Sequence, residues 1–197
     1  MYKLFVKRVI DILLSSLALI GLAFPMLVIA IFVKFSSKGP VFFWQKRVGK
    51  DKNTFMMPKF RSMYMETPAE IPTHLLNDPT RWITPVGRIL RKTSLDELPQ
   101  LFSILTGKMS IVGPRPALWN QEDLICERDK YGANDIRPGL TGWAQINGRD
   151  ELPIDVKAKY DGEYLKKMSF LFDLKCVLMT ILKVAKYDGV VEGGCKR

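Results

Sequence analysis

A long run of uncharged, mostly apolar residues, 12–33, lies close to the start of the chain. Its length is near the roughly 20 residues that a helix needs to cross a bilayer. Pro25 lies near the middle of the run and removes one backbone hydrogen bond, so we expect a kink there. The run is too long for a cleaved signal peptide, and Asp11 directly precedes it. The pattern therefore predicts a membrane helix that is broken near its centre.

Basic residues flank this run on both sides. The residues concerned are Lys3, Lys7 and Arg8 before it, and Lys34, Lys38, Lys46 and Arg47 after it. A helix that crosses the bilayer should carry its Lys and Arg mainly at the cytoplasmic end. Charges at both ends favour a re-entrant helix, which enters one leaflet, bends at Pro25 and returns; a single spanning helix with a tolerated kink is the alternative. We therefore predict a re-entrant membrane helix over residues 1–36 and a cytoplasmic, membrane-associated catalytic domain over residues 37–197.

The remaining pattern predicts an α+β fold, mainly helical, with one short β-hairpin. Residues 41–45 and 54–57 are typical of short strands, and the polar residues 49–53 form the turn between them. Thr84-Pro85 predicts a helix start, because Thr caps a helix well and Pro suits its first position. Further helices are expected over residues 117–131, 155–166 and 169–186. A surface loop is expected over residues 66–79, and a compact loop with one strand over residues 137–149.

The last of these helices, residues 169–186, is amphipathic. Its apolar stripe consists of Phe170, Leu174, Val177, Leu178, Ile181 and Ala185, and three lysines lie outside the stripe. Such a helix packs its stripe on the core, or lies in the membrane interface with its lysines toward the headgroups. The predicted fold includes amphipathic helices that lie in the membrane interface.

The composition narrows the classes of partner. The chain has 197 residues and a net charge of +10, from 30 Lys and Arg against 20 Asp and Glu. Such an excess favours an anionic partner, which is a phosphorylated metabolite, an anionic membrane surface or nucleic acid. The three cysteines form no CxxC pair and the chain has one histidine, which argues against a zinc site.

Two adjacent carboxylates, Asp96 and Glu97, lie among cations. The helix predicted from Thr84 carries Arg88, Arg91 and Lys92 on one face, directly before the acidic pair. A further cation follows in the stiff segment Gly-Pro-Arg-Pro, residues 113–116. This mixture of charges indicates a site for a phosphorylated substrate and a divalent metal.

The acidic pair also has a purely structural interpretation. Ser94 and Glu97 match a capping box, and Asp96 would then complement the helix dipole. Pro99 disfavours Ser94 as the cap, because it would remove a real hydrogen bond; with Asp96 as the cap, Pro99 falls in the first turn. In both cases Asp96 lies at the positive end of a helix, where Arg91 should help to keep it ionised. An ionised Asp can attack phosphorus or hold Mg²⁺.

Taken together, the motifs resemble the bacterial sugar transferase family, in particular its small monotopic phosphoglycosyl transferases. The motifs are SLDELPQL at 94–101, GPRP at 113–116 and RPGLTGWAQINGR at 137–149, behind an apolar segment with a central Pro. The resemblance implies transfer of a phospho-sugar from a UDP-sugar to a polyprenol phosphate, typically undecaprenyl phosphate, with release of UMP. This reaction is the first membrane step of a glycan assembly pathway. The implied place is the cytoplasmic face of the bacterial inner membrane, with membrane lipid as a partner and no nucleic acid.

The resemblance also implies roles for individual residues. Asp96 is the expected nucleophile on the sugar-linked phosphate, through a covalent aspartyl phospho-sugar intermediate. Glu97 is expected to assist Asp96 and Mg²⁺, or to act as the base for the incoming lipid phosphate, and both carboxylates are candidate Mg²⁺ ligands. The candidate substrate-binding residues are Lys59, Arg61, Arg88, Arg91, Arg115, Arg137, Gln145 and Arg149. The family's usual Ser-Pro break is Phe24-Pro25 here, so the proline of the membrane break is kept.

Two other hypotheses remain open. The first keeps the overall reaction but uses a direct ternary complex, in which Asp96 and Glu97 only bind Mg²⁺. The second is a membrane-anchored basic module that binds nucleic acid or anionic lipid. Its charge fits, but it gives no reason for an acidic pair between cations.

Overall fold

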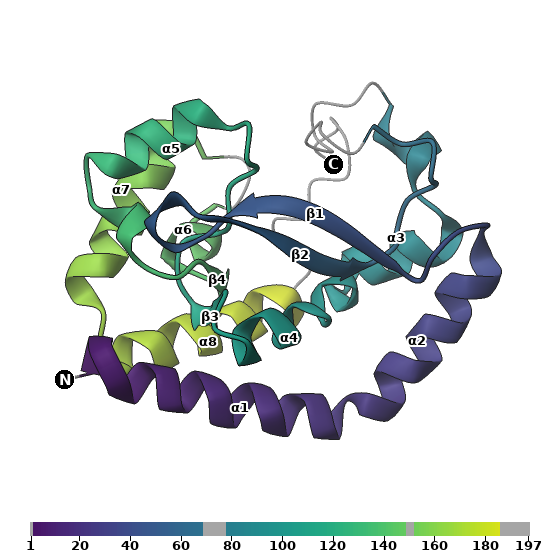
Figure 1. The fold of residues 1–197 in the computed structure, drawn as a ribbon, viewed down its shortest axis with the longest axis horizontal. Coiled ribbons are helices and arrows are strands. Elements are labelled where there is room, and N and C mark those ends of the chain that lie inside the picture. The colour runs from purple at the N-terminus through teal and green to yellow at the C-terminus, as the bar shows by residue number, and fades with distance from the viewer. Residues whose placement is uncertain (1, 69–77, 149–151, 186–197) are drawn as a thin grey trace.

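The computed structural model describes residues 2–68, 78–148 and 152–185, and over them the fold is α+β and mainly helical, as predicted. The helices are α1 (Lys7–Gly21), α2 (Ala23–Ser36), α3 (Pro85–Lys92), α4 (Gln100–Leu105), α5 (Glu122–Asp129), α6 (Trp143–Ile146), α7 (Ile154–Lys167) and α8 (Phe170–Ala185). The strands are β1 (Phe42–Val48), β2 (Thr54–Phe60), β3 (Ser110–Val112) and β4 (Gly139–Thr141). Figure 1 shows the β1–β2 hairpin crossing the middle of the molecule, with α1 along the lower edge of the view.

The apolar N-terminal segment folds as two helices, α1 and α2, that meet at a bend of 62°. The break falls at Leu22, about one turn before Pro25. Because Pro25 has no N–H, the carbonyl of Gly21 loses its helical partner and the axis turns there. Within the described residues, only α1 and α2 taken together have the length and apolar character of a membrane span, and no single helix does. The predicted kink is therefore present, slightly earlier than the proline itself.

The β1–β2 hairpin is antiparallel and longer than predicted. Phe42 pairs with Phe60 at its open end, and Val48 pairs with Thr54 beside the turn. Lys59 therefore belongs to β2 and does not follow it. Pro58 is tolerated inside β2, because each strand of a two-stranded sheet has a free edge where an N–H is not needed. A second pair, β3 and β4, is parallel, and only β4 lies in a region where a strand was expected.

Two helical predictions need correction. The helix expected over 117–131 is shorter, because Leu118 pairs with Arg47 and donates its N–H to the side chain of Gln121, which holds residues 117–121 outside the helix. The compact loop expected over 137–149 contains the short helix α6 in addition to its strand. Residues 69–77 of the expected surface loop lie outside the described residues, as does Lys186.

The N-terminal helices contribute directly to the core. Ala18, Leu19 and Leu22 pack against a buried cluster that consists of Met57, Leu101, Ile104 and Met109. Val33 of α2 is fully buried with Phe60 and Leu90. Both clusters join the N-terminal helices to β2, the first together with α4 and the second together with α3. The N-terminal segment is therefore packed into the rest of the fold.

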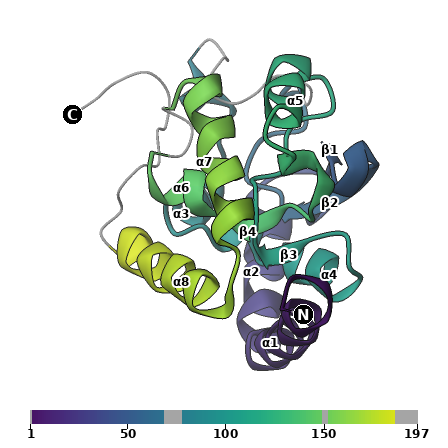
Figure 2. The same cartoon turned by 90° about the vertical axis from the view of Figure 1, so that its left-hand side faces the viewer.

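One face of α8 packs inward, and the predicted apolar stripe remains largely exposed. Cys176 is fully buried and Val177 packs against the same cluster. The exposed apolar side chains of α8 are Phe170, Leu171, Leu174, Leu178, Ile181 and Leu182. Figures 1 and 2 place α8 beside α1, and Lys7 Nζ lies 2.6 Å from Asp173 Oδ2 across this contact. Of the two expectations for the stripe, packing on the core is therefore wrong for most of its residues.

The start of α3 yields a prediction about stability. Thr84 caps the helix as expected, accepting the N–H of Gly87 at 2.9 Å. A Cβ on Gly87 would lie 1.9 Å from the carbonyl oxygen of Ser62, so the backbone must shift. We expect Gly87→Ala to lower the free energy of unfolding by about 1–3 kcal/mol, measured as the melting temperature in detergent. Gly21→Ala is the matched control, because its Cβ would meet nothing within 4 Å; equal melting temperatures for the two variants would contradict the packing argument.

Candidate active site

Asp96 and Glu97 lie in a short 3₁₀ turn, Leu95–Glu97, between α3 and α4. Ser94 adopts a left-handed conformation, with φ of 57°, and its side chain makes no capping hydrogen bond. Pro99 stands at the N-cap position of α4, and neither carboxylate caps a helix. Both capping interpretations are therefore wrong. They assumed a helix that starts at Ser94 or Asp96, but a separate 3₁₀ turn holds the two carboxylates and α4 begins only after Pro99.

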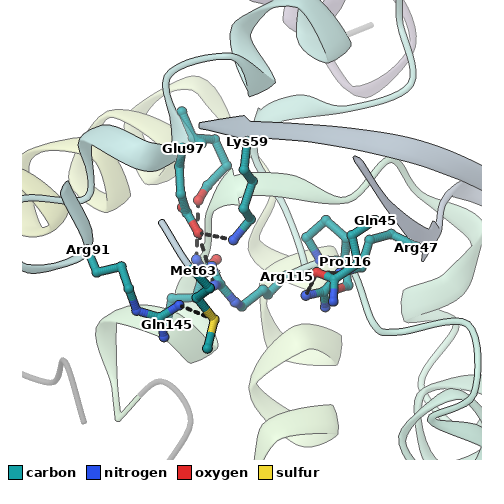
Figure 3. Close-up of polar contacts among 10 residues, drawn as sticks. Gln45, Arg47, Lys59, Met63, Arg91, Glu97, Arg115, Pro116 and Gln145 are labelled. Carbon is teal, nitrogen blue, oxygen red and sulfur yellow. Dashed lines mark hydrogen bonds and ion pairs between the residues drawn. The ribbon is translucent and has the colours of Figure 1, made fainter. Parts of the chain in front are cut away.

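Glu97 is held by two cations on one oxygen. Its Oε1 lies 2.9 Å from Lys59 Nζ and 3.1 Å from Arg115 Nη2 (Figure 3). Lys59 comes from β2, and Arg115 comes from the segment after β3. Burial opposes ionisation of Glu97, but the charges and hydrogen bonds of Lys59 and Arg115 outweigh it and hold the pKa of Glu97 well below its usual range. The ionised form of Glu97 is therefore favoured, and Lys59 and Arg115 form a cationic clamp around it.

Asp96 lies in a different environment, although it is the adjacent residue. Its side chain is 7% exposed. Burial raises the pKa of Asp96 to about 6, and the negative charge of Glu97 adds to this effect, against the opposing charges of Lys59, Arg91 and Arg115. Arg91 lowers the pKa of Asp96, as expected, but burial outweighs the nearby cations, and the sequence alone did not indicate that burial. Two adjacent carboxylates thus have pKa values displaced in opposite directions, as is typical of acid–base sites.

Arg91 brings a further guanidinium toward Asp96 from the last turn of α3. Its Nη1 contacts the sulfur of Met63 at 3.7 Å (Figure 3). Its Nε is buried and has no hydrogen-bond partner among the described residues. A buried N–H donor without an acceptor is poorly satisfied, and a sulfur is a weak acceptor for the neighbouring Nη1. Arg91 is therefore the cation of the site with donors suited to an added anionic group.

The segment that carries Arg115 is pinned on both sides. Gly113 donates its N–H to the carbonyl of Thr141 at 2.8 Å, which ties the segment to β4. Arg47 donates to the carbonyl of Pro116 at 2.9 Å and to the side chain of Gln45 (Figure 3). The sequence-based prediction did not include Arg47 among the site residues. Arg47 lies two positions after Gln45 and therefore on the same face of β1, and this spacing is the signal that could have indicated it.

Arg61 has a structural role, away from the carboxylates. Arg61 is 3% exposed as a whole residue, and its guanidinium donates to the carbonyl oxygens of Val33, Ser37 and Lys38. These carbonyls lie at the C-terminal end of α2, where helical carbonyls lack partners and cations are favoured. The structure therefore does not place Arg61 with the other predicted substrate-binding residues.

The other predicted residues lie in several places. Arg88 is exposed on α3, and Arg137 is exposed and donates to the carbonyl of Gly107 at 2.8 Å. Gln145 is buried on α6, where its Nε2 donates to the carbonyl of Leu140 and its Oε1 has no partner among the described residues. Arg149 lies outside the described residues. The residues that converge on the acidic pair are thus Lys59, Arg91 and Arg115.

The acidic pair could supply some, but not all, of the ligands that a Mg²⁺ ion needs. No group of three or more His, Cys, Asp or Glu side chains that could hold a metal is found in the described part of the chain. Protein sites for Mg²⁺ commonly supply one or two carboxylates and take the remaining ligands from substrate phosphates and water. Asp96 and Glu97 fit that pattern, since together they offer carboxylate oxygens beyond the one that Lys59 and Arg115 contact.

Comparisons with known proteins show which family this chain resembles. Residues 2–187 match the model of the bacterial sugar transferase family. The chain is 43% identical over 185 residues to the UDP-glucose:undecaprenyl-phosphate glucose-1-phosphate transferase of Escherichia coli K12, a match that covers 90% of this chain and 39% of that protein. It is 36% identical over 199 residues to the undecaprenyl-phosphate galactose phosphotransferase of Salmonella typhimurium, covering 94% of this chain and 41% of that protein.

A third relative matches along most of its own length. The protein named "Uncharacterized sugar transferase EpsL", from Bacillus subtilis, is 37% identical over 186 residues, which cover 94% of this chain and 90% of that protein. The chain therefore spans about two fifths of the first two relatives and nearly all of the third. The family match and these identities show that this chain belongs to the bacterial sugar transferase family.

Proposed function

We propose that this chain transfers a phospho-sugar from a UDP-sugar to undecaprenyl phosphate and releases UMP. The observation that carries the proposal is the buried Asp96 beside Glu97, with Lys59, Arg91 and Arg115 around them. Donor, acceptor and released UMP are all anionic, so a site for this reaction needs several cations to offset their repulsion. The name of the E. coli relative contains both a UDP-sugar and undecaprenyl phosphate, and the name of the S. typhimurium relative contains undecaprenyl phosphate, which supports this pair of substrates.

The proposed reaction has two steps. In the first, an oxygen of the Asp96 carboxylate attacks the phosphorus that carries the sugar. The new oxygen–phosphorus bond forms as the bond to the bridging oxygen breaks, and that oxygen leaves with its electron pair as part of UMP. In the second step, a phosphate oxygen of undecaprenyl phosphate attacks the same phosphorus and the Asp96 carboxylate leaves. Because UMP can depart first, the two anionic substrates need not occupy the site together.

The clamp around Glu97 supports this chemistry. Lys59 and Arg115 share one Glu97 oxygen, which fixes both cations beside Asp96. Arg91 would take the phosphate oxygens, since its buried Nε has no partner in the described part of the chain. Asp96 and Glu97 would hold Mg²⁺ together with the diphosphate, and the bound ion would neutralise charge on the diphosphate. Glu97 remains ionised throughout, because its pKa is held low.

The covalent step is tested by mass spectrometry. The protein is incubated with Mg²⁺ and, in turn, each member of a panel of UDP-sugars without lipid, and the peptide with Asp96 is weighed. We expect the mass of one phospho-sugar on that peptide and an equal amount of released UMP for the accepted donor. Turnover with lipid but no adduct, together with intersecting initial-rate lines, would instead support the direct ternary complex with Asp96 and Glu97 acting only on Mg²⁺.

The pH dependence follows from the raised pKa of Asp96. A nucleophilic carboxylate must be ionised, and burial raises its pKa to about 6. We therefore expect kcat/KM for the UDP-sugar to be level above this pH and to fall about tenfold per pH unit below it. The fall should not come from Glu97, whose pKa is displaced downward. A profile that stays level down to pH 4.5, near the ordinary Asp range, would contradict this assignment.

We also propose that α1 and α2 form a re-entrant membrane helix and that α8 lies in the interface beside it. The exposed apolar side chains of the first two helices include Ile12, Leu13, Leu17, Ile20, Phe24, Leu27, Ile31, Phe32 and Phe35. Figure 2 places α8 beside α1, and the exposed apolar side chains of these helices favour membrane contact. Tags at the two termini should be reached by a protease only from the cytoplasmic face. An N-terminal tag that is cleaved from the periplasmic face would instead support a spanning helix.

A further inference from the structure

Asp11 is a buried carboxylate at the polar end of α1. It is 3% exposed, and its Oδ1 accepts the backbone N–H of Ile111 at 3.0 Å. Ile111 is the central residue of β3. A carboxylate beside a membrane-associated run is costly unless it is well paired, so this contact calls for a function.

The contact gives a hydrogen-bond acceptor to a backbone N–H on the outer edge of β3. β3 pairs with β4 through Ser110 and Val112, and Ser110 donates its N–H to the carbonyl of Pro138 on that side. Since successive N–H groups of a strand point to opposite edges, the N–H of Ile111 points away from β4. Asp11 accepts it there, in the place that a third strand would otherwise take. The second edge of β3 is thus held by α1.

Arg8 makes a second contact of the same kind. Its Nη1 and Nη2 donate to the carbonyls of Ile104 and Leu105 at 2.6 and 2.8 Å. These are terminal carbonyls of α4, where the helix dipole favours a cation. α4 follows the turn that carries Glu97, and β3 precedes the segment that carries Arg115. Arg8 and Asp11 of α1 therefore hold α4 and β3, which are the two elements between Glu97 and Arg115 in the chain.

We propose that Asp11 is a positioning residue for Arg115, and through it for the clamp on Glu97. Asp11 fixes the edge of β3, and the chain runs from β3 through Gly113, itself tied to Thr141, to Arg115. Arg115 then reaches Glu97 at 3.1 Å. A misplacement of about 1 Å in such a site can cost roughly a hundredfold in rate. The proposal rests on the proposed function for its activity measurement only.

The test compares Asp11→Leu with Asp11→Asn in the full chain, reconstituted in nanodiscs of anionic phospholipid. Leu is apolar and should keep the protein in the bilayer, but it cannot accept the N–H of Ile111. We expect kcat to fall about tenfold to a hundredfold, and the peptide with Ile111 to exchange its amide hydrogen faster. Asn keeps an acceptor oxygen, so Asp11→Asn should retain kcat within about twofold and the slow exchange. Asp11→Ala, which adds no bulk, is measured alongside so that misfolding of the Leu variant does not decide the result.

Ser15→Ala is the matched control on the same side of α1. Ser15 is fully buried, but among the described residues its hydroxyl donates to the carbonyl of Ile12 within the same helix, so the wild-type rate and exchange are expected. Wild-type kcat and exchange in both Asp11→Leu and Asp11→Ala would overturn the proposal. An Asn variant as impaired as the Leu variant would also overturn it, because charge and not hydrogen-bond acceptance would then matter. If the wild type releases no UMP from any UDP-sugar, the proposed function fails, while the exchange at Ile111 still decides the positioning contact.

Discussion

Asp96→Asn is expected to lower kcat by a factor of about 10⁴ to 10⁶ and to abolish the phospho-sugar adduct. The amide has nearly the shape of the carboxylate, so the packing of this side chain, 7% exposed, should be kept. It has no anionic oxygen to attack phosphorus, and removal of a nucleophile typically leaves only the catalysis due to binding and charge. The measurement is the rate of UMP release, together with the mass of the peptide that contains Asp96.

The same variant should be no less stable than the wild type. Burial raises the pKa of Asp96 to about 6, so the folded state binds this proton more tightly than the unfolded state does. The folded protein therefore loses stability as the pH rises from about 4 through 6, at a cost on the order of 2–3 kcal/mol at neutral pH. Asparagine removes that cost, so the melting temperature at pH 7 should equal or exceed that of the wild type.

Asp135→Asn is a suitable control, because Asp135 is an exposed carboxylate outside the site and should keep the wild-type rate. Retention of more than about one per cent of the activity in Asp96→Asn would exceed what loss of a nucleophile permits. A phospho-sugar adduct found on another residue of the Asp96→Asn protein would show that Asp96 is not the nucleophile. Either result would leave Asp96 as a metal ligand at most.

Glu97→Gln should lower kcat by about 10² to 10³ and also lower the melting temperature. Lys59 Nζ and Arg115 Nη2 both contact one oxygen of Glu97, and a neutral amide cannot hold two cations there. The cations would separate, and Asp96 would lose the arrangement that surrounds it. The opposite effects of the two substitutions on stability follow from the opposite displacements of the two pKa values.

A double substitution separates the clamp from other roles of Glu97. If the loss of stability comes from unpaired cations, Glu97→Gln combined with Lys59→Gln should cost less than the sum of the two single changes. Thermal unfolding of the four proteins in the same detergent measures this coupling. Strict additivity, or a Glu97→Gln protein that melts and reacts like the wild type, would show that the ion pairs do not hold the site together.

Local signals in the sequence were sufficient for several elements. The uncharged run with Pro25 determined a bent helix pair, because a proline removes a helical hydrogen bond whatever surrounds it. Thr84 determined the start of α3, since a side-chain cap needs only neighbouring residues. The hairpin and α7 followed from their periodicity and turn residues. The motifs also predicted the acidic pair as the centre of the site.

Local signals failed where a distant contact competes with them. Ser94 and Glu97 match a capping box, but the left-handed turn at Ser94 and the pull of Lys59 and Arg115 on Glu97 prevent it. Arg61 lies next to the hairpin in the sequence, yet it caps the carbonyls at the end of α2, because that helix end packs beside it. A sequence motif cannot indicate which of two partners a charged side chain meets.

The sequence by itself determined that a carboxylate pair stands among cations behind a broken apolar segment. Only the tertiary structure decided which cations contact Glu97 and that Asp96 is buried. It brings together Lys59, which is 38 positions before Glu97, and Arg115, which is 18 positions after it, on one oxygen. It also buries Asp96, and this burial outweighs the nearby cations and raises the pKa of that carboxyl group. Burial and long-range ion pairs depend on packing between distant segments, and no local pattern of residues specifies that packing.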